Sequence, residues 1–262
     1  MSAEKGWNII SKSYQKNTKI SLQDVHYGPI SPGESELKLL GDVKGKDILE
    51  VGCGGGQNSI VLSKWGANVA GLDISERQIE YAKKLARKEH AKVRFYLGNM
   101  ENLTIFADRS FDIGLSSFAV GYVDHLSTTF AEIYRVLRKK GIFVFADVHP
   151  IANRGRAMRY GKTRRWALAD YFDRRDRKWI WRTEKAVAKF VGHKRTIQDY
   201  FDLLTLMGFI VRRIMEPEPY HIDRMSETEM KKIPYLHEWY VRTFDLWKRV
   251  PYTIIFKCEK VI

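Results

Sequence analysis

The sequence predicts an α/β fold, in which a mostly parallel, doubly wound sheet has helices on both of its faces. The first observation is that apolar, strand-like runs alternate with helical patterns along the chain. The second is that a glycine-rich loop follows the first of these runs, as it does in doubly wound sheets that bind a nucleotide. The predicted strands are residues 47–52, 68–73, 92–97, 111–116 and 142–147.

The first predicted strand runs directly into a loop in which side chains are nearly absent. The apolar residues of this strand are interrupted by Glu50 near its end, and the glycines that follow are Gly52, Gly54 and Gly56. Glycine accepts positive φ freely and lets a backbone lie against a ligand. Residues 57–59 then open a helical pattern, so the free amides of the loop lie at a helix N-terminus. This strand, loop and helix predict a nucleotide site.

The spacing of the glycines favours S-adenosylmethionine over a dinucleotide. A dinucleotide fingerprint reads G-x-G-x-x-G, whereas these glycines alternate as G-x-G-x-G and Gln57 stands at the sixth position. The second strand ends in Asp73, whose carboxylate can accept hydrogen bonds from both ribose hydroxyls. That acid is common to both cofactor classes, so the glycine spacing decides between them. A nicotinamide-dependent oxidoreductase is the less favoured alternative.

The other elements are predicted from their ends. The helix after the second strand begins at Ser75, and Gln78 stands three residues later, as in a capping box. The helix before the fifth strand has apolar residues at helical spacing, with a stop at 139–141. A third helix is capped by Thr196. Strands are predicted at 208–211 and 251–258.

With these motifs in order, the chain resembles a class I S-adenosylmethionine-dependent methyltransferase, of the group that includes the ubiquinone- and menaquinone-type enzymes. The resemblance implies a Rossmann-like sheet of seven strands, the last one antiparallel, and S-adenosylmethionine as methyl donor with S-adenosylhomocysteine as product. One departure is that the family often has Gly-Asp where this chain has Gly98-Asn99. The matching motifs are residues 49–56, 71–75, 98–103, 110–112 and 132–138, followed by Gly141.

The resemblance also implies roles for residues of the cofactor site. Glu50 would orient the methionyl amino group, and Gly52, Gly54 and Gly56, with Cys53 among them, would line the methionyl arm. Asp73 would hold the ribose hydroxyls, and Ile74 would pack on adenine. The remaining contacts would come from Asn99 and Met100 at the adenine edge and from the backbone carbonyl of Ser116.

Simpler interpretations of three of these residues stay open. Asp73 can instead cap a helix, Ile74 can be a core residue, and Gln78 can be either a helix cap or a ribose contact. The spacing alone does not choose between these roles.

Length and composition agree with a single α/β domain over residues 1–262. We expect residues 1–42 to cap the cofactor, 43–149 to form the cofactor-binding core, and 196–262 to complete the sheet. No apolar run approaches the ~20 residues that span a bilayer, and no signal sequence is recognisable, so a cytoplasmic protein is expected. The two cysteines suggest neither a disulfide framework nor a metal site.

Residues 151–195, which we call the lid, are unusually basic. They hold 15 Lys and Arg against 4 Asp and Glu, in a chain whose net charge is +14. An insertion after the C-terminal end of a strand is placed to roof a ligand site. Strand-like composition at 171–173, 178–181 and 186–191 predicts a β-hairpin, with cations such as Arg174, Arg175 and Arg177 directed outward.

The methyl acceptor is less clearly indicated. His149, after the fifth strand, can face the site as a base or be structural, and Tyr122 can orient an acceptor or only pack. His193, Arg195, Trp179 and Trp181 are candidate lid contacts. Residues 116–119 replace the Asn-Pro-Pro-Tyr-like tetrapeptide typical of enzymes that methylate amino groups and bases. We expect a small, possibly acidic acceptor. The alternative is RNA such as tRNA, held by the cations and aromatic rings of the lid.

Overall fold

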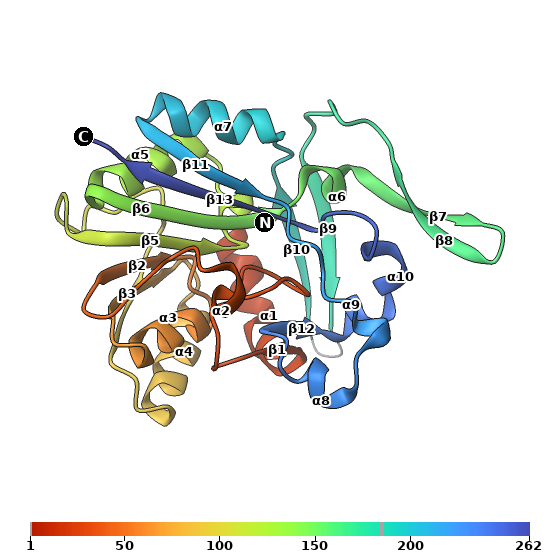
Figure 1. Cartoon of the computed structure of the whole chain (residues 1–262), viewed down its shortest axis with the longest axis horizontal. Helices are drawn as coiled ribbons and strands as arrows, with labels where there is room; N and C mark the ends of the chain where they lie inside the picture. The colour runs from red at the N-terminus through yellow and green to blue at the C-terminus, as the bar shows by residue number, and fades with distance from the viewer. Residues whose placement is uncertain (1, 184–185) are drawn as a thin grey trace.

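A computed structural model describes residues 2–183 and 186–262 and places them around one seven-stranded sheet (Figure 1). The strand order is β11-β13-β6-β5-β2-β3-β4, and β13 is antiparallel to both of its neighbours. The predicted doubly wound, mostly parallel sheet is therefore confirmed. Its strands are β2 (Asp47–Val51), β3 (Asn68–Asp73), β4 (Val93–Leu97), β5 (Phe111–Ser117), β6 (Leu137–Val148), β11 (Phe209–Met215) and β13 (Thr253–Lys260).

Helices cover both faces of this sheet (Figure 1). On one face, α5 (Leu126–Val136) and α7 (Ile197–Leu206) pack in a cluster that includes Phe143 and Phe145. On the other face, α3 (Gln57–Lys64) packs in a cluster that includes Val144 and Ala146. Alternate residues of β6 thus point to opposite cores, as the two-residue period of a strand requires. α4 (Glu76–Lys88) contacts β3 and β4.

Two predicted helix ends need correction. α5 ends at Val136 and not at 139–141, because Leu137 is already extended and pairs with Phe111 of β5. The capping box at Ser75 is only half formed. The Ser75 hydroxyl accepts a hydrogen bond from the Gln78 amide, but the Gln78 side chain turns toward Gln15 instead. At Thr196 a reciprocal capping box with Asp199 is present.

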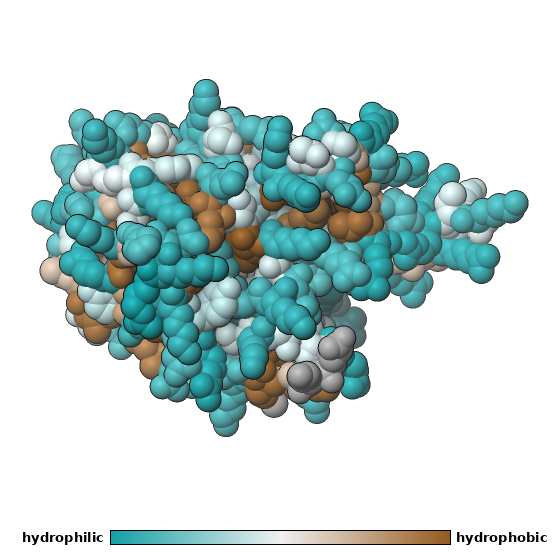
Figure 2. All heavy atoms as spheres, turned by 90° about the horizontal axis from the view of Figure 1, so that it is seen from below, coloured by the Kyte–Doolittle hydropathy of each residue, from teal (hydrophilic) through white to brown (hydrophobic). Residues whose placement is uncertain are grey.

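The lid contains two hairpins instead of one. After the short α6 (Pro150–Arg154) come β7 (Gly155–Tyr160) and β8 (Thr163–Leu168), which the sequence did not predict, and then β9 (Arg177–Arg182) and β10 (Val187–Gly192). The expected strand at 171–173 is wrong, because the carboxylates of Asp170 and Asp173 accept backbone amide hydrogen bonds that form turns there. The β7–β8 hairpin projects from the body and is largely hydrophilic (Figures 1 and 2).

Segments from both ends of the chain cover the carboxyl edge of the sheet. α1 (Ala3–Asn17) packs against β10 and α4, and β1 (Thr18–Ile20) pairs with β12 (Tyr235–His237). The short α2 (Glu34–Leu37) follows. Residues 216–252, here the C-terminal cap, were expected to continue the sheet. They instead form η2 (Ile222–Arg224), α8 (Glu227–Met230), β12, α9 (Glu238–Arg242) and α10 (Phe244–Trp247).

The C-terminal cap has its own apolar cluster, which includes Ile30, Phe244 and Trp247. Burying apolar side chains of this size contributes about 1.5–3 kcal/mol each. Trp166 of β8 joins the cluster, with its ring centroid 4.6 Å from that of Trp247. In the described part of the chain, no helix is both long and apolar enough to cross a bilayer.

Candidate active site

A cavity of about 650 Å³ lies at the carboxyl ends of β2, β3, β5 and β6. Strand order reverses at β2 and β5, and this switch point is where open α/β sheets bind ligands. The volume lies in the ordinary range for small-molecule sites. The cavity is also lined by residues of α1, β9, β10 and the C-terminal cap, so it is enclosed from several sides.

The loop after β2 brings backbone to one side of the cavity. Gly52 has φ 70°, and a Cβ there would lie 2.2 Å from the Cβ of Ala119. Gly54 has φ 53°, but a Cβ there would meet nothing within 4 Å. Glycine at position 52 is therefore required by a close approach as well as by φ, whereas Gly54 leaves open space for a ligand.

Asp73 joins this loop to the end of β3. One carboxylate oxygen accepts a hydrogen bond from the Gly54 amide and the other from the Ser75 amide, both at 2.8 Å. The side chain is nearly buried, and burial raises the pKa of Asp73 to about 6. Each oxygen keeps a further lone pair. Since Asp73 lines the cavity, it can act as a cap and still accept hydrogen bonds from a ligand.

Glu50 is the second carboxylate on this side. Burial raises the pKa of Glu50 to about 7, although its carboxylate accepts a hydrogen bond from the Ser59 hydroxyl. Nearby, Gln57 donates to Gln15 at 2.7 Å, and Gln15 donates to Gln78 at 2.9 Å. These glutamines hold α1 against the loop. Gln78 thus faces the cavity, where a ligand can reach it.

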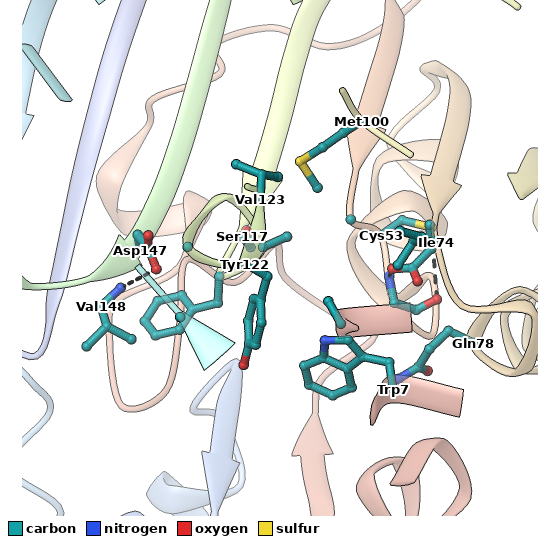
Figure 3. Close-up of a pocket in the computed structure, with 18 of the residues that line it drawn as sticks. Trp7, Cys53, Ile74, Gln78, Met100, Ser117, Tyr122, Val123, Asp147 and Val148 are labelled. Atoms are coloured by element: carbon teal, nitrogen blue, oxygen red, sulfur yellow. Dashed lines mark hydrogen bonds between the residues drawn. The ribbon is translucent and has the colours of Figure 1, made fainter. Parts of the chain in front are cut away.

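Most of the other expected cofactor residues meet at this side of the cavity. Cys53, Ile74, Asn99 and Met100 line it, and Figure 3 shows Met100, Cys53, Ile74 and Gln78 on the same side. Gly56 does not line it, because it begins α3 behind the loop. Ser116 does not line it either.

Ser116 is fully buried, and its hydroxyl donates to the Val51 carbonyl within the sheet. Its neighbour Ser117 lines the cavity instead. The strand alternation of β5 turns these two side chains in opposite directions. The contact expected from the backbone carbonyl of Ser116 does not depend on this side chain and stays a prediction.

Aromatic side chains surround the other side of the cavity, which we call the aromatic chamber. Tyr122, on η1 (Val120–Tyr122), has its ring centroid 5.6 Å from that of Trp7 (Figure 3) and 5.7 Å from that of Trp179. Two of the expected lid residues, Trp179 and Trp181, thus belong to this chamber. Its rings are those of Trp7, Tyr14, Tyr122, Trp179, Trp181, Tyr235, Tyr240 and Tyr252.

His149 does not line the cavity. It is fully buried, its Nε2 is 2.6 Å from Glu216, and its Nδ1 accepts a hydrogen bond from the Ile151 amide. The cause is local, because Pro150 begins α6 and makes His149 the N-cap of that helix. The geometry gives His149 a structural position and not the cavity-facing one that a base needs.

Asp147, two residues earlier, reaches the cavity instead (Figure 3). Its carboxylate accepts hydrogen bonds from the Tyr200 hydroxyl and from the Val148 amide, both at 2.7 Å. Burial raises the pKa of Asp147. A polar residue at the end of a parallel strand is the signal that could have identified it.

The two basic lid candidates differ in position. His193 lines the cavity between Asp176 and Asp124, with ring nitrogens 2.9 and 3.2 Å from the respective carboxylates. Arg195 does not line the cavity. Its guanidinium donates to the carbonyls of Val120 and Val123, so it fixes the turn that carries Tyr122. Arg177, which the sequence placed outward, lines the cavity instead.

Sequence reasoning missed five residues of the chamber, namely Trp7, Tyr14, Tyr235, Tyr240 and Tyr252. The hydroxyls of Tyr14 and Tyr235 are 2.9 Å apart, and those of Tyr240 and Tyr252 are 2.7 Å apart. Burial raises the pKa of Tyr14 to about 12 and also raises the pKa of the other three. All four phenols therefore stay protonated near neutral pH.

His26 was also missed. Its side chain is nearly buried at the cavity wall, and its Nδ1 has no hydrogen-bond partner among residues 2–183 and 186–262. Burial lowers the pKa of His26 to about 4, so the ring is neutral at physiological pH. Its backbone is bonded to the side chains of Asn58 and Ser117. Only the tertiary structure brings this loop to the strand ends.

Comparison with known proteins identifies the core. The methyltransferase domain family matches residues 49–145, which include the glycine loop and Asp73. Residues 49–145 are a methyltransferase domain. The crystal structure of an S-adenosylmethionine-dependent methyltransferase from Mesorhizobium loti has the same fold as this chain. It has a TM-score of 0.67 at 24% identity, over 85% of this chain and 94% of that one.

Two curated relatives are similar over a shorter stretch. An uncharacterized methyltransferase of Bacillus subtilis (strain 168) is 34% identical over 109 residues, 42% of this chain and 43% of that protein. A malonyl-[acyl-carrier protein] O-methyltransferase of Pectobacterium atrosepticum is 38% identical over 116 residues, 44% of each chain. The similarity to this methyltransferase domain thus spans less than half the length of either relative.

Proposed function

We propose that this protein transfers a methyl group from S-adenosylmethionine to a small-molecule acceptor bound in the aromatic chamber. The observation that carries the proposal is the continuity of the cavity. One continuous space of about 650 Å³ extends from the glycine loop and Asp73 to the rings of the lid and the C-terminal cap. A donor and a compact acceptor can therefore meet inside the protein.

The residues on the glycine-loop side fit the cofactor. Gly54 leaves open space at the loop, and Asp73 keeps lone pairs for ribose hydroxyls. Polar and apolar side chains line the same space, namely those of Glu50, Gln78, Asn99 and Met100. When bound, S-adenosylmethionine supplies an electrophilic methyl group on a sulfonium that carries its own leaving group.

The protein's own contribution is then to position the acceptor and to exclude water. Alignment of bound reactants can supply much of the rate in such a reaction. Where the acceptor must lose a proton, Asp147 is the carboxylate in the chamber that can receive it. His26, neutral and nearly buried, is a further polar side chain at the cavity wall.

The names of similar proteins agree with a small acceptor but do not identify the acceptor of this protein. One similar protein is named for methylating a malonyl group on an acyl-carrier protein, and another for methylating phthiotriol dimycocerosates. Membership of the ubiquinone and menaquinone group is part of this proposal. RNA is the second candidate acceptor, because the β7–β8 hairpin has five Lys and Arg and no Asp or Glu over residues 155–168.

Calorimetry tests the cofactor first. S-adenosylhomocysteine should bind with micromolar affinity, and NADH and NADPH should not bind. The acceptor class is then tested by incubating the protein with labelled S-adenosylmethionine and either a small-metabolite fraction or tRNA. Label in the small-metabolite fraction supports the proposal. Label in the tRNA alone gives the function to the RNA alternative, and dinucleotide binding without S-adenosylhomocysteine binding refutes both.

A further inference from the structure

Two cations from the lid line the cavity, and their surroundings differ. The Lys194 ammonium is paired with Asp173 at 2.5 Å. Arg177, by contrast, has a neutral partner, because its guanidinium donates to the side-chain oxygen of Asn153 at 2.9 Å. No carboxylate within the described residues lies within ion-pairing distance of it. A guanidinium has five N–H donors, so most of those of Arg177 are left for another group.

Three other arginines of the lid are paired with carboxylates. Arg174 pairs with Asp199, Arg175 pairs with Asp173 at 2.8 Å, and Arg164 pairs with Asp245 at 2.7 Å. None of these three lines the cavity. What distinguishes Arg177 from the other lid arginines is that it lines the cavity, and it does so without a carboxylate partner among the described residues.

Arg177 is also held in a direction that faces the chamber. Its guanidinium lies over the ring of Trp179, 5.5 Å from the ring centroid. Its positive charge opposes the burial that raises the pKa of Tyr122 and Tyr252. Asp147 acts on the same two phenols with the opposite sign, yet Asp147 and Arg177 form no ion pair. The chamber therefore contains one deep carboxylate and one separate cation at its mouth.

The other charged groups at the mouth are already engaged. Asp124 and Asp176 both contact His193, and Asp173 is shared between Lys194 and Arg175. Of the lid cations that line the cavity, Arg177 is therefore the one without a carboxylate partner in the described part of the chain.

We propose that Arg177 binds a carboxylate group of the methyl acceptor, while the rings of the chamber hold the rest of that molecule. A carboxylate matches the planar fork of a guanidinium, which can donate two parallel hydrogen bonds to it. The acceptor is then a compact, largely apolar or aromatic acid. This inference rests on the proposed function and specifies its substrate class.

Benzoate and benzyl alcohol are suitable probes, because they share a ring and differ in charge. Their binding is measured by ligand-observed NMR with S-adenosylhomocysteine at saturation. We expect benzoate to bind at least five times more tightly than benzyl alcohol. Arg177→Gln should weaken benzoate binding about tenfold and leave benzyl alcohol unchanged, and Arg177→Lys should recover part of the loss.

Arg175→Gln is the matched control, because it removes a lid arginine outside the cavity, and it should leave both probes unchanged. Equal binding of the two probes to the wild-type protein overturns the inference, and so does unchanged benzoate binding to Arg177→Gln. S-adenosylhomocysteine affinity is measured for every variant. If the wild-type protein does not bind S-adenosylhomocysteine, the proposed function itself is refuted. If it binds S-adenosylhomocysteine but does not prefer benzoate, only the role of Arg177 is refuted.

Discussion

The glycine-loop side of the cavity is formed mainly by backbone at the ends of β2 and β3, whereas the aromatic chamber is formed by side chains from four distant segments. Gly52, Gly54 and Asp73 lie within one short stretch of sequence, but Tyr14, Tyr122, Trp179 and Tyr235 do not. Backbone contacts constrain residue types tightly, because a Cβ would occupy the ligand's space or a neighbour's. A wall formed by side chains does not restrict the residue type at each position in this way. The aromatic chamber is therefore the part of the cavity in which acceptor specificity can differ between relatives.

The largest expected effect is at the most constrained backbone position. Gly52→Ala should lower the free energy of unfolding by about 2–4 kcal/mol, because the new methyl group meets Ala119 and positive φ strains the backbone. Urea unfolding measures the change. Gly54→Ala is the control, since it has the same sign of φ with open space, and it should lose only about 1 kcal/mol. Equal losses would contradict the distinction between the two glycines.

Asp73→Ala tests whether this carboxylate holds a ligand as well as the loop. S-adenosylhomocysteine binding should weaken by about 1.5–3 kcal/mol, the scale of lost hydrogen bonds to a charged acceptor. Calorimetry measures it, and circular dichroism checks the fold. The control Asp42→Ala removes an exposed carboxylate that lies outside the cavity. An unchanged dissociation constant in folded Asp73→Ala would leave the residue a loop cap only.

Glu50 should make stability depend on pH. Its folded-state pKa is about 7, above the unfolded value, so the folded chain keeps a proton that the unfolded chain releases. Stability from this group is therefore lost as pH rises from about 4.5 to about 7. Glu50→Gln should gain stability relative to the wild type between pH 5 and pH 8, as followed by urea unfolding at each pH.

Glu89→Gln is the matched control for that series. A hydrogen bond from Lys64 lowers the pKa of Glu89, so this group is ionised in both the folded and the unfolded chain above about pH 5. Glu89→Gln should therefore keep a constant offset from the wild type between pH 5 and pH 8. If Glu50→Gln keeps a constant offset from the wild type at every pH, burial does not raise the pKa of Glu50 in solution.

The smallest effect is expected for cations outside the cavity. Replacing Arg156, Arg159 and Arg165 of the β7–β8 hairpin with Gln should change stability and S-adenosylhomocysteine affinity by less than about 0.5 kcal/mol. Turnover with a small acceptor should also be unchanged. Steeply salt-dependent tRNA binding that disappears in this triple variant would instead support the RNA alternative.

The sequence predicted the glycine-loop side well because that side depends on local rules. Its features can be recognised within about 25 residues of sequence. They are the strand periods, the glycine spacing and the position of Asp73 at a strand end. At the end of β5 the pattern did not settle which side chain faces the cavity, and it is the side chain of Ser117 and not that of Ser116 that lines it.

The aromatic chamber could not be predicted in the same way. Tyr235, Tyr240 and Tyr252 lie in a cap whose short helices have no strong period, and it was expected to belong to the sheet. His149 was the expected base, and Asp147 was not considered, because the sequence did not show that His149 is the N-cap of α6. The basic composition of the lid did not indicate which arginine lines the cavity, because that depends on where the tertiary structure places β9.

The pairing of β1 with β12 has a consequence for how the protein is made. It joins Thr18 to His237, and the nearby hydroxyl contact joins Tyr14 to Tyr235, which are 221 positions apart. During translation, α1 and β1 leave the ribosome before the C-terminal cap, so β1 has no partner strand until that cap follows. The aromatic chamber can therefore close only after the C-terminal cap has been made.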